Sequence, residues 1–75
     1  MARAQYTLDL EAAQDDLLLL GQRVETAIGN SVDALQNRDF KLAQKVVEED
    51  DEIDHLQIVL EERCIDIIAM QAPMA

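Results

Sequence analysis

Two helical patterns, separated by a very short break, limit this chain to few folds. Over residues 7–36, apolar side chains recur at alternating intervals of three and four, as they do along one side of an α-helix. The same spacing returns over residues 40–70. A connection as short as residues 37–39 forces two neighbouring helices to lie antiparallel. The sequence therefore predicts an all-α fold, a long antiparallel helical hairpin with helices at about 7–36 and 40–70.

The hairpin has two apolar stripes and no third element to cover them. Each helix would be about 45 Å long at a rise of about 1.5 Å per residue. Two amphipathic helices alone leave much of each stripe in water, so we expect a third helix or a second hairpin. Oligomerisation into a four-helix-type bundle is the simplest way to complete the core. The stripes consist of Leu10, Ala13, Leu17, Leu20, Val24, Ala27 and Ile28, and of Ala43, Val46, Val47, Ile53, Leu56, Leu60, Cys64, Ile67 and Ile68.

Several residues indicate where the helices begin and end. Thr7 is a candidate N-cap of the first helix, and Asp39 of the second, because their side-chain oxygens can accept free amide protons. Asn37 suits a left-handed position after the first helix. Gly21 and Gly29 fall inside the first helix, where each costs about 1 kcal/mol relative to alanine. We interpret both glycines as positions of close helix packing.

Length and charge exclude several classes of function. The chain has 75 residues, enough for one small unit, and a net charge of −10. Nucleic acids and anionic membranes would repel such a chain, which leaves cations, basic protein surfaces or further copies of itself as partners. The longest aliphatic run, residues 17–20, is far too short to insert in a membrane, and the N-terminus shows no signal peptide. We expect a soluble, cytoplasmic protein.

An acidic run in the second helix is the candidate site. Five acids occupy residues 48–52. Asp50 interrupts the apolar stripe, and Asp54 follows four residues later, so their Cβ atoms lie about 5–6 Å apart. Like charges at this spacing destabilise a helix, and a bound cation would offset that repulsion. The spacing predicts a metal site at Asp50 and Asp54 for iron, Mn²⁺, Zn²⁺ or Mg²⁺, to which a second helix would add ligands.

Simpler interpretations stay open for these residues. An acidic run is more often a solvated helix face, and His55 points about 100° away from Asp54 around the helix. Cys64, the single cysteine, fits a small core residue. The sequence contains no paired nucleophile and base, no phosphate-binding loop and no cofactor fingerprint. We predict no catalytic residues and no enzymatic activity.

The motifs together resemble one family. The turn "NRD" followed by "LA", the acidic stretch "VVEEDDEIDHL" and the segment "LEERCIDIIAMQAP" are similar to the first part of a PhoU domain. This resemblance covers nearly the whole chain, residues 6–75, as a single partial domain. It implies membership of a three-helix bundle whose third helix, with a second acidic motif, is not in these 75 residues.

The resemblance also implies a function. PhoU proteins are cytoplasmic negative regulators of phosphate uptake and of the phosphate-starvation response. They are thought to connect the phosphate ABC transporter with a phosphate-sensing histidine kinase, and some bind metal clusters through acidic motifs that correspond here to Asp50 and Asp54. Two other hypotheses remain: a metal-binding helical-bundle protein that stores or senses cations, and a plain dimerisation module in which the acids maintain solubility.

Overall fold

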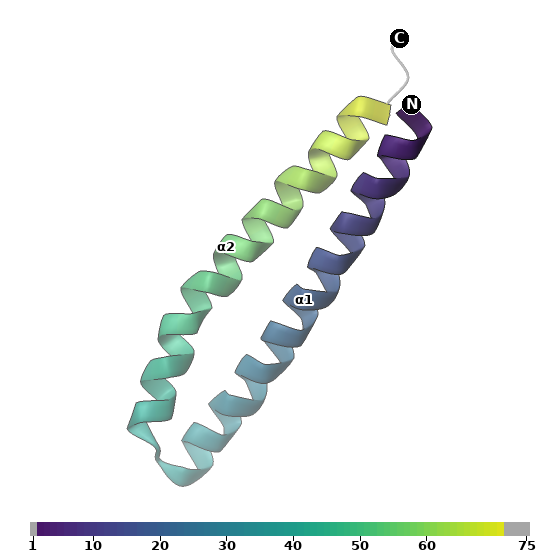
Figure 1. The fold of residues 1–75 in the computed structure, drawn as a ribbon. Coiled ribbons are helices and arrows are strands. Elements are labelled where there is room, and N and C mark those ends of the chain that lie inside the picture. The colour runs from purple at the N-terminus through teal and green to yellow at the C-terminus, as the bar shows by residue number, and fades with distance from the viewer. Residues whose placement is uncertain (1, 72–75) are drawn as a thin grey trace.

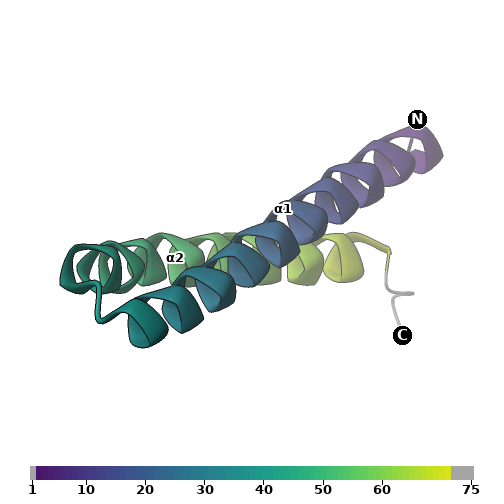
Figure 2. The same ribbon diagram turned by 90° about the horizontal axis from the view of Figure 1, so that it is seen from below.

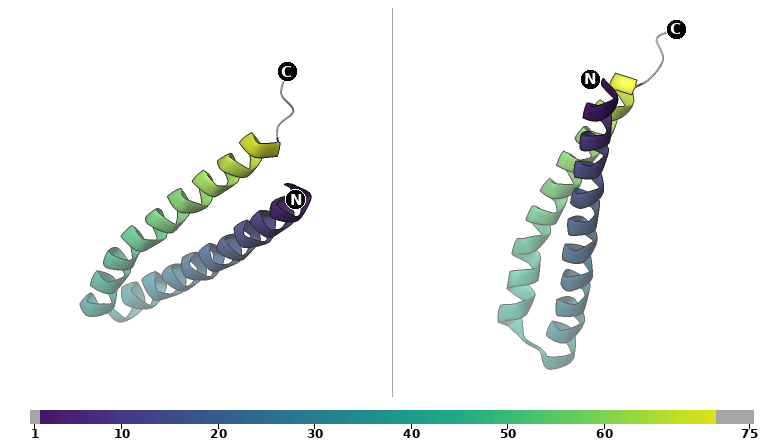
Figure 3. Two further views of the ribbon diagram at one scale, coloured as in Figure 1. Left: turned by 45° about the horizontal axis from the view of Figure 1, so that its top comes forward. Right: turned by 45° about the vertical axis from the view of Figure 1, so that its right-hand side comes forward.

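The computed structural model describes residues 2–71, and this part of the chain forms a single layer of two helices (Figure 1). Helix α1 spans Ala2–Asn37 and helix α2 spans Phe40–Gln71. The helices are antiparallel, so the start of α1 and the end of α2 lie together (Figure 1). They are inclined to each other rather than strictly parallel (Figures 2 and 3). The elongated hairpin measures 56 × 19 × 14 Å, which confirms the predicted architecture.

The start of α1 differs from the prediction. The helix begins at Ala2 rather than at Thr7, because the intervening residues are good helix formers and nothing stops the helix there. Thr7 is therefore not an N-cap. Its hydroxyl donates a hydrogen bond to the carbonyl of Arg3 at 3.1 Å, as mid-helix threonines commonly do. The side-chain amide of Gln5 donates to Asp9 at 2.7 Å and supports this first part of the helix.

The end of α1 has the hydrogen-bond pattern of a left-handed helix C-cap. The left-handed residue is Arg38, with φ of 51°, and not Asn37, which is the last residue of the helix. The amide of Asp39 donates to the carbonyl of Ala34 at 3.0 Å. This bond satisfies one of the carbonyls that a helix end leaves free. The predicted turn is thus correct in position, but its left-handed residue is Arg38, one residue after the predicted Asn37.

The start of α2 confirms the predicted cap. A side-chain oxygen of Asp39 accepts a hydrogen bond from the amide of Leu42 at 3.0 Å, and its carbonyl accepts from the amide of Ala43 at 3.0 Å. One residue thereby ends the turn and begins the second helix.

Removal of this cap is expected to destabilise the hairpin. Asp39→Ala leaves the Leu42 amide without its acceptor, and we expect the free energy of unfolding to fall by about 1 kcal/mol. Urea unfolding, followed by helical circular dichroism at one protein concentration, measures the difference. Asp39→Asn keeps the side-chain acceptor and is the matched control. Equal losses in both variants would mean that the charge of Asp39, and not its capping bond, is what matters.

The seam between the two helices is thin and partly polar. Within residues 2–71, the buried apolar residues are two alanines and one leucine: Ala13, Ala34 and Leu60. Two ion pairs cross the seam. Arg63 lies 3.2 Å from Asp16, and Arg23 lies 3.6 Å from Glu52. Half-buried side chains complete the seam at alternating intervals of three and four, as in coiled coils. They include Asp9, Asp16, Leu20, Ala27 and Asn30 of α1, and Leu42, Val46, Glu49, Ile53, Leu56, Arg63 and Ile67 of α2.

Neither glycine serves the contact between the two helices. A Cβ atom added at Gly21 or at Gly29 would meet nothing within 4 Å. The interpretation of these residues as positions of close packing is therefore wrong for α1 against α2. Gly21 instead leaves a notch in the exposed part of α1.

Candidate acidic site and apolar face

One broad face of the hairpin is rich in apolar side chains. Near the turn, Leu35 of α1 and Phe40, Ala43 and Val47 of α2 line an open apolar groove of about 420 Å³, together with Ser31. We call the face that carries this groove the apolar face. Along α1 it continues through side chains that are 38–80% exposed: Leu10, Leu17, Val24, Ile28 and Leu35. The seam thus takes Ala13, Leu20 and Ala27 of the α1 stripe, and the other large side chains of the stripe face water.

The two predicted site residues lie on this same face. Residues seven positions apart keep the same orientation to the seam in a pair of helices packed with this spacing. Asp50 is seven residues after Ala43, and Asp54 is seven residues after Val47. Because Ala43 and Val47 line the apolar groove, the two aspartates continue the apolar face along α2. Glu61, seven residues after Asp54, extends this acidic ridge, which we define as Asp50, Asp54 and Glu61.

The ridge carboxylates have no cationic partner in the part of the chain described. Asp50 and Asp54 are both exposed. The ion pairs of residues 2–71 involve other acids: Glu49 with Lys45, and Glu52 and Asp16 with the two seam arginines. Glu61 accepts a hydrogen bond from the Gln57 amide at 3.1 Å. The ridge therefore places hydrated negative charge beside exposed apolar side chains.

The carboxylates of the ridge are the type of ligand that a hard cation prefers, but they are too few to fill its coordination shell. Carboxylate oxygens are the ligands that Mg²⁺, Mn²⁺ and iron prefer, and such ions take about six. Over residues 2–71 there is no group of three His, Cys, Asp or Glu side chains placed to share one ion. Asp50 and Asp54 alone could supply part of a coordination shell. Water or another helix would have to supply the rest.

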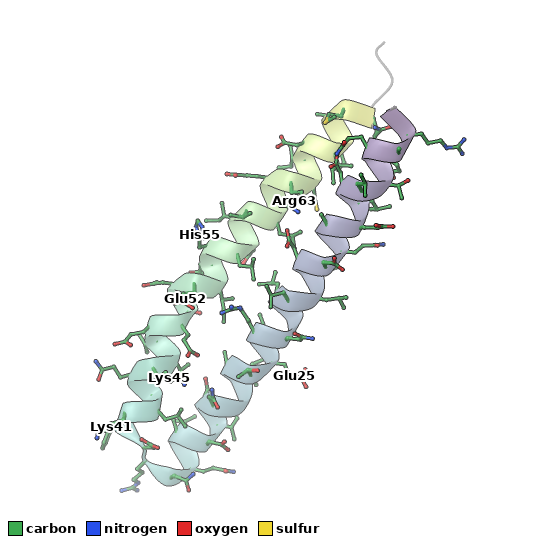
Figure 4. The ribbon with its side chains drawn as sticks, viewed as in Figure 1. Glu25, Lys41, Lys45, Glu52, His55 and Arg63 are labelled. Atoms are coloured by element: carbon green, nitrogen blue, oxygen red, sulfur yellow. The ribbon has the colours of Figure 1, made fainter. Side chains whose placement is uncertain are left out.

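The other candidate residues take no part in the ridge. His55 is exposed and points away from α1, as expected for a surface residue (Figure 4). Cys64 is a free thiol and only half-buried, since one neighbouring helix covers just one side of it. Arg63, in contrast, lies on the side of α2 that faces α1 (Figure 4). Neither described helix is long and apolar enough to cross a membrane.

Sequence reasoning missed the groove at the turn. Phe40 follows the N-cap Asp39 directly and is 83% exposed, which is unusual for the chain's one phenylalanine. A large aromatic residue in the first turn of a helix was the available signal. Phe40 alone does not predict the groove, because Leu35 of α1 also lines it. The left-handed residue Arg38 determines where Leu35 lies relative to Phe40.

Comparison with known proteins identifies the family. The model of the PhoU domain matches residues 17–75, which include the turn, the acidic ridge and most of the apolar face. The chain belongs to the PhoU family. Curated PhoU proteins match over almost the whole chain. The phosphate-specific transport system accessory protein PhoU of Escherichia coli is 30% identical over 71 residues, which are 95% of this chain and 30% of that protein.

Two PhoU homologues from other bacteria are somewhat more similar. The PhoU homolog of Clostridium acetobutylicum is 35% identical over 99% of this chain and 34% of its own length. That of Pseudomonas aeruginosa is 37% identical over 95% of this chain and 29% of its own length. The chain thus spans about a third of the length of these PhoU relatives. No solved structure matches the chain.

Proposed function

We propose that this chain belongs to a PhoU-type negative regulator of phosphate uptake and of phosphate-starvation signalling. The match of the PhoU domain to residues 17–75 is the observation that carries this proposal. The relatives are named as accessory proteins of the phosphate-specific transport system. The hairpin offers exposed helical surfaces and no arrangement typical of a reaction centre. We infer that it acts by protein contacts rather than by catalysis, and in the cytoplasm, as the resemblance to PhoU proteins implies.

The proposed partners are the phosphate ABC transporter and a phosphate-sensing histidine kinase. The test immobilises the purified chain and offers it the transporter's ATPase subunit or the cytoplasmic part of the kinase. We expect retention of at least one of the two. A histidine kinase for an unrelated signal is the control. If neither phosphate protein is retained better than this control, the proposal fails for this part of the protein.

Metal binding is proposed as an adjunct of this regulation. Asp50 and Asp54 would hold iron, Mn²⁺, Zn²⁺ or Mg²⁺ through their carboxylates, and the ion would neutralise the repulsion along the ridge. Metal binding at the ridge would agree equally well with the alternative of a cation-sensing helical bundle. Retention by the phosphate proteins separates the two, since a general cation sensor would not be retained.

Neutralisation of the ridge is expected to abolish metal binding. The purified chain is equilibrated with iron or Mn²⁺, and the metal per chain is measured by elemental analysis. We expect the unchanged chain to bind metal and the Asp50→Asn/Asp54→Asn variant to bind none, because both replaced carboxylates would be ligands. Glu48→Gln/Asp51→Asn removes the same charge from exposed positions outside the ridge and is the matched control. Equal loss in both double variants would indicate a diffuse attraction of cations instead of a site.

A further inference from the structure

The broad face of the hairpin opposite the apolar face has a different composition. Leu19 comes two positions after Leu17 of the apolar face, and two positions turn a side chain by about 200° around a helix. Glu52 follows Asp50 in the same way. We call this opposite side the polar face; residues seven apart share it, and they are Ala12, Leu19, Thr26 and Asp33 of α1 and Lys45, Glu52, Val59 and Asp66 of α2. The third helix that a PhoU-type bundle implies would cover the apolar face, so the polar face is the side available to a partner.

The polar face contains a pocket near the open end of the hairpin. Its volume is about 370 Å³, and both helices contribute to its lining. The half-buried side chains of Val59 and Ile67 form an apolar wall, which the exposed Met70 extends. Three carboxylates lie around this wall, and they belong to Asp9 of α1 and to Glu62 and Asp66 of α2. The pocket thus combines an apolar surface with negative charge.

The negative charge of the pocket is not offset by the cation that also lines it. Arg63 points toward α1 (Figure 4), and its guanidinium already lies 3.2 Å from Asp16. Asp9 accepts a hydrogen bond through one oxygen, Oδ1, and its other oxygen remains open to a further donor. Within residues 2–71, Glu62 and Asp66 form no ion pair and accept no side-chain hydrogen bond. The pocket therefore has acceptors for a cation from another molecule.

The arrangement of the carboxylates fits an extended cation and not a metal ion. No three His, Cys, Asp or Glu side chains of residues 2–71 are placed to share one ion, so the acids of the pocket are too far apart for that. Glu62 and Asp66 are four residues apart on α2, which puts their Cβ atoms about 5–6 Å from each other. A guanidinium group has five N–H donors in a planar fork and can bond to two carboxylates at once. The aliphatic part of an arginine would then lie against Val59 and Ile67.

An arginine of a partner protein fits this pocket better than free arginine does. The free amino acid has a carboxylate of its own, which the acids of the pocket and the net charge of −10 would repel. An arginine within a protein lacks that group. Neighbouring residues of the partner would also reach Leu19, which is 41% exposed on the same face. The negative charge of the chain would in addition attract a basic partner from a distance.

We propose that this pocket of the polar face binds an arginine side chain of a partner protein. Glu62 and Asp66 bond to the guanidinium, and Val59 and Ile67 cover the aliphatic stem. Binding weakens as ionic strength rises, because salt screens the attraction. This inference goes beyond the proposed function, since it requires an exposed arginine on the partner and no particular partner. Retention by the phosphate proteins is a separate measurement, so either idea can fail without the other.

Titration with a peptide tests the chemistry of the pocket. The probe is a short helical peptide of alanine and leucine with one arginine and both ends blocked. Nuclear magnetic resonance follows the methyl signals of the chain, and we expect those of Val59 and Ile67 to shift and to saturate. The same peptide with citrulline, which keeps the shape of arginine without its charge, is expected to bind at least about tenfold more weakly. Equal binding of the citrulline peptide, or of a peptide with lysine, would overturn the proposal that the pocket recognises a guanidinium.

Substitution of the two carboxylates tests the location. Glu62→Gln/Asp66→Asn is expected to weaken binding of the arginine peptide at least about tenfold, because both acceptors lose their charge. Glu25→Gln/Asp51→Asn removes the same charge from exposed positions outside the apolar and polar faces and is the matched control. Circular dichroism confirms that both variants stay helical. Equal losses in both variants, or shifts confined to methyl groups of the apolar face, would overturn the proposal.

Discussion

Leu60→Ala is expected to lower the free energy of unfolding by about 2–3 kcal/mol. Leu60 is the one large apolar side chain that is buried in residues 2–71, at 7% exposure. Its truncation removes the most completely buried large side chain of the seam and leaves a cavity behind. The value lies near the lower end for buried leucines because a two-helix layer can partly collapse around the cavity. A domain of this size has only a few kcal/mol of stability, so most of it would be lost.

Urea unfolding at a single protein concentration measures this effect, since association would otherwise change the apparent stability. Ile58→Ala is the matched control. Ile58 lies two residues away on the same helix and is 53% exposed, so its truncation is expected to change stability by no more than about 0.5 kcal/mol. Similar losses in both variants would mean that the seam of α1 and α2 is not the core of this protein.

Ala13→Leu is expected to destabilise the hairpin by about 1–3 kcal/mol, although it adds apolar surface. Ala13 is 6% exposed in the seam, where a small side chain lets the two helices approach each other. A leucine there has to separate the helices locally or adopt a strained rotamer. The ion pair of Asp16 and Arg63, one turn away, would lengthen with that separation.

Thermal unfolding of Ala13→Leu beside Ala69→Leu measures this cost. Ala69 is exposed on α2, and leucine is nearly as good a helix former as alanine, so the control is expected to be close to neutral. A stabilised Ala13→Leu protein would show that the seam contains unfilled space and is looser than the burial of Ala13 indicates.

Much of the fold could be predicted because its signals are local. The start of α2 depends on Asp39 and its immediate neighbours, and that prediction is confirmed by the bond to the Leu42 amide. The predicted start of α1 is wrong because Thr7, although a possible cap, lies in a segment that is helical anyway. Cap residues indicate where a helix is able to begin, and the helix formers before them decide whether it begins earlier.

The assignment of faces could not be predicted from one sequence. The spacing placed Ala13 and Leu17 in one stripe, but the stripe is wider than a single neighbouring helix can cover. The structure turns Ala13 toward α2 and leaves Leu17 in water. The ion pairs of Arg23 and Arg63 depend on the register between the two helices. That register follows from the geometry of the turn and not from any local pattern.

The candidate site also combines features that the sequence predicts with features that depend on contacts between distant segments. The i, i+4 spacing of Asp50 and Asp54 follows directly from the sequence, and so does the prediction that Asp50 interrupts the apolar stripe. Their metal binding stays a prediction. Ligands from a second helix depend on contacts between distant segments or between chains, which spacing along one helix does not define.

The turn at Arg38 and Asp39 also determines the order in which this hairpin forms. Its hydrogen bonds link residues at most five positions apart, so they can close before any distant contact exists. Loops of about ten residues close within about 10–100 ns. Each successive layer of the seam then needs only the layer before it, and the two helices join progressively from the turn toward Ala2 and Gln71. The same order in reverse makes the open end the first part of the hairpin to fray.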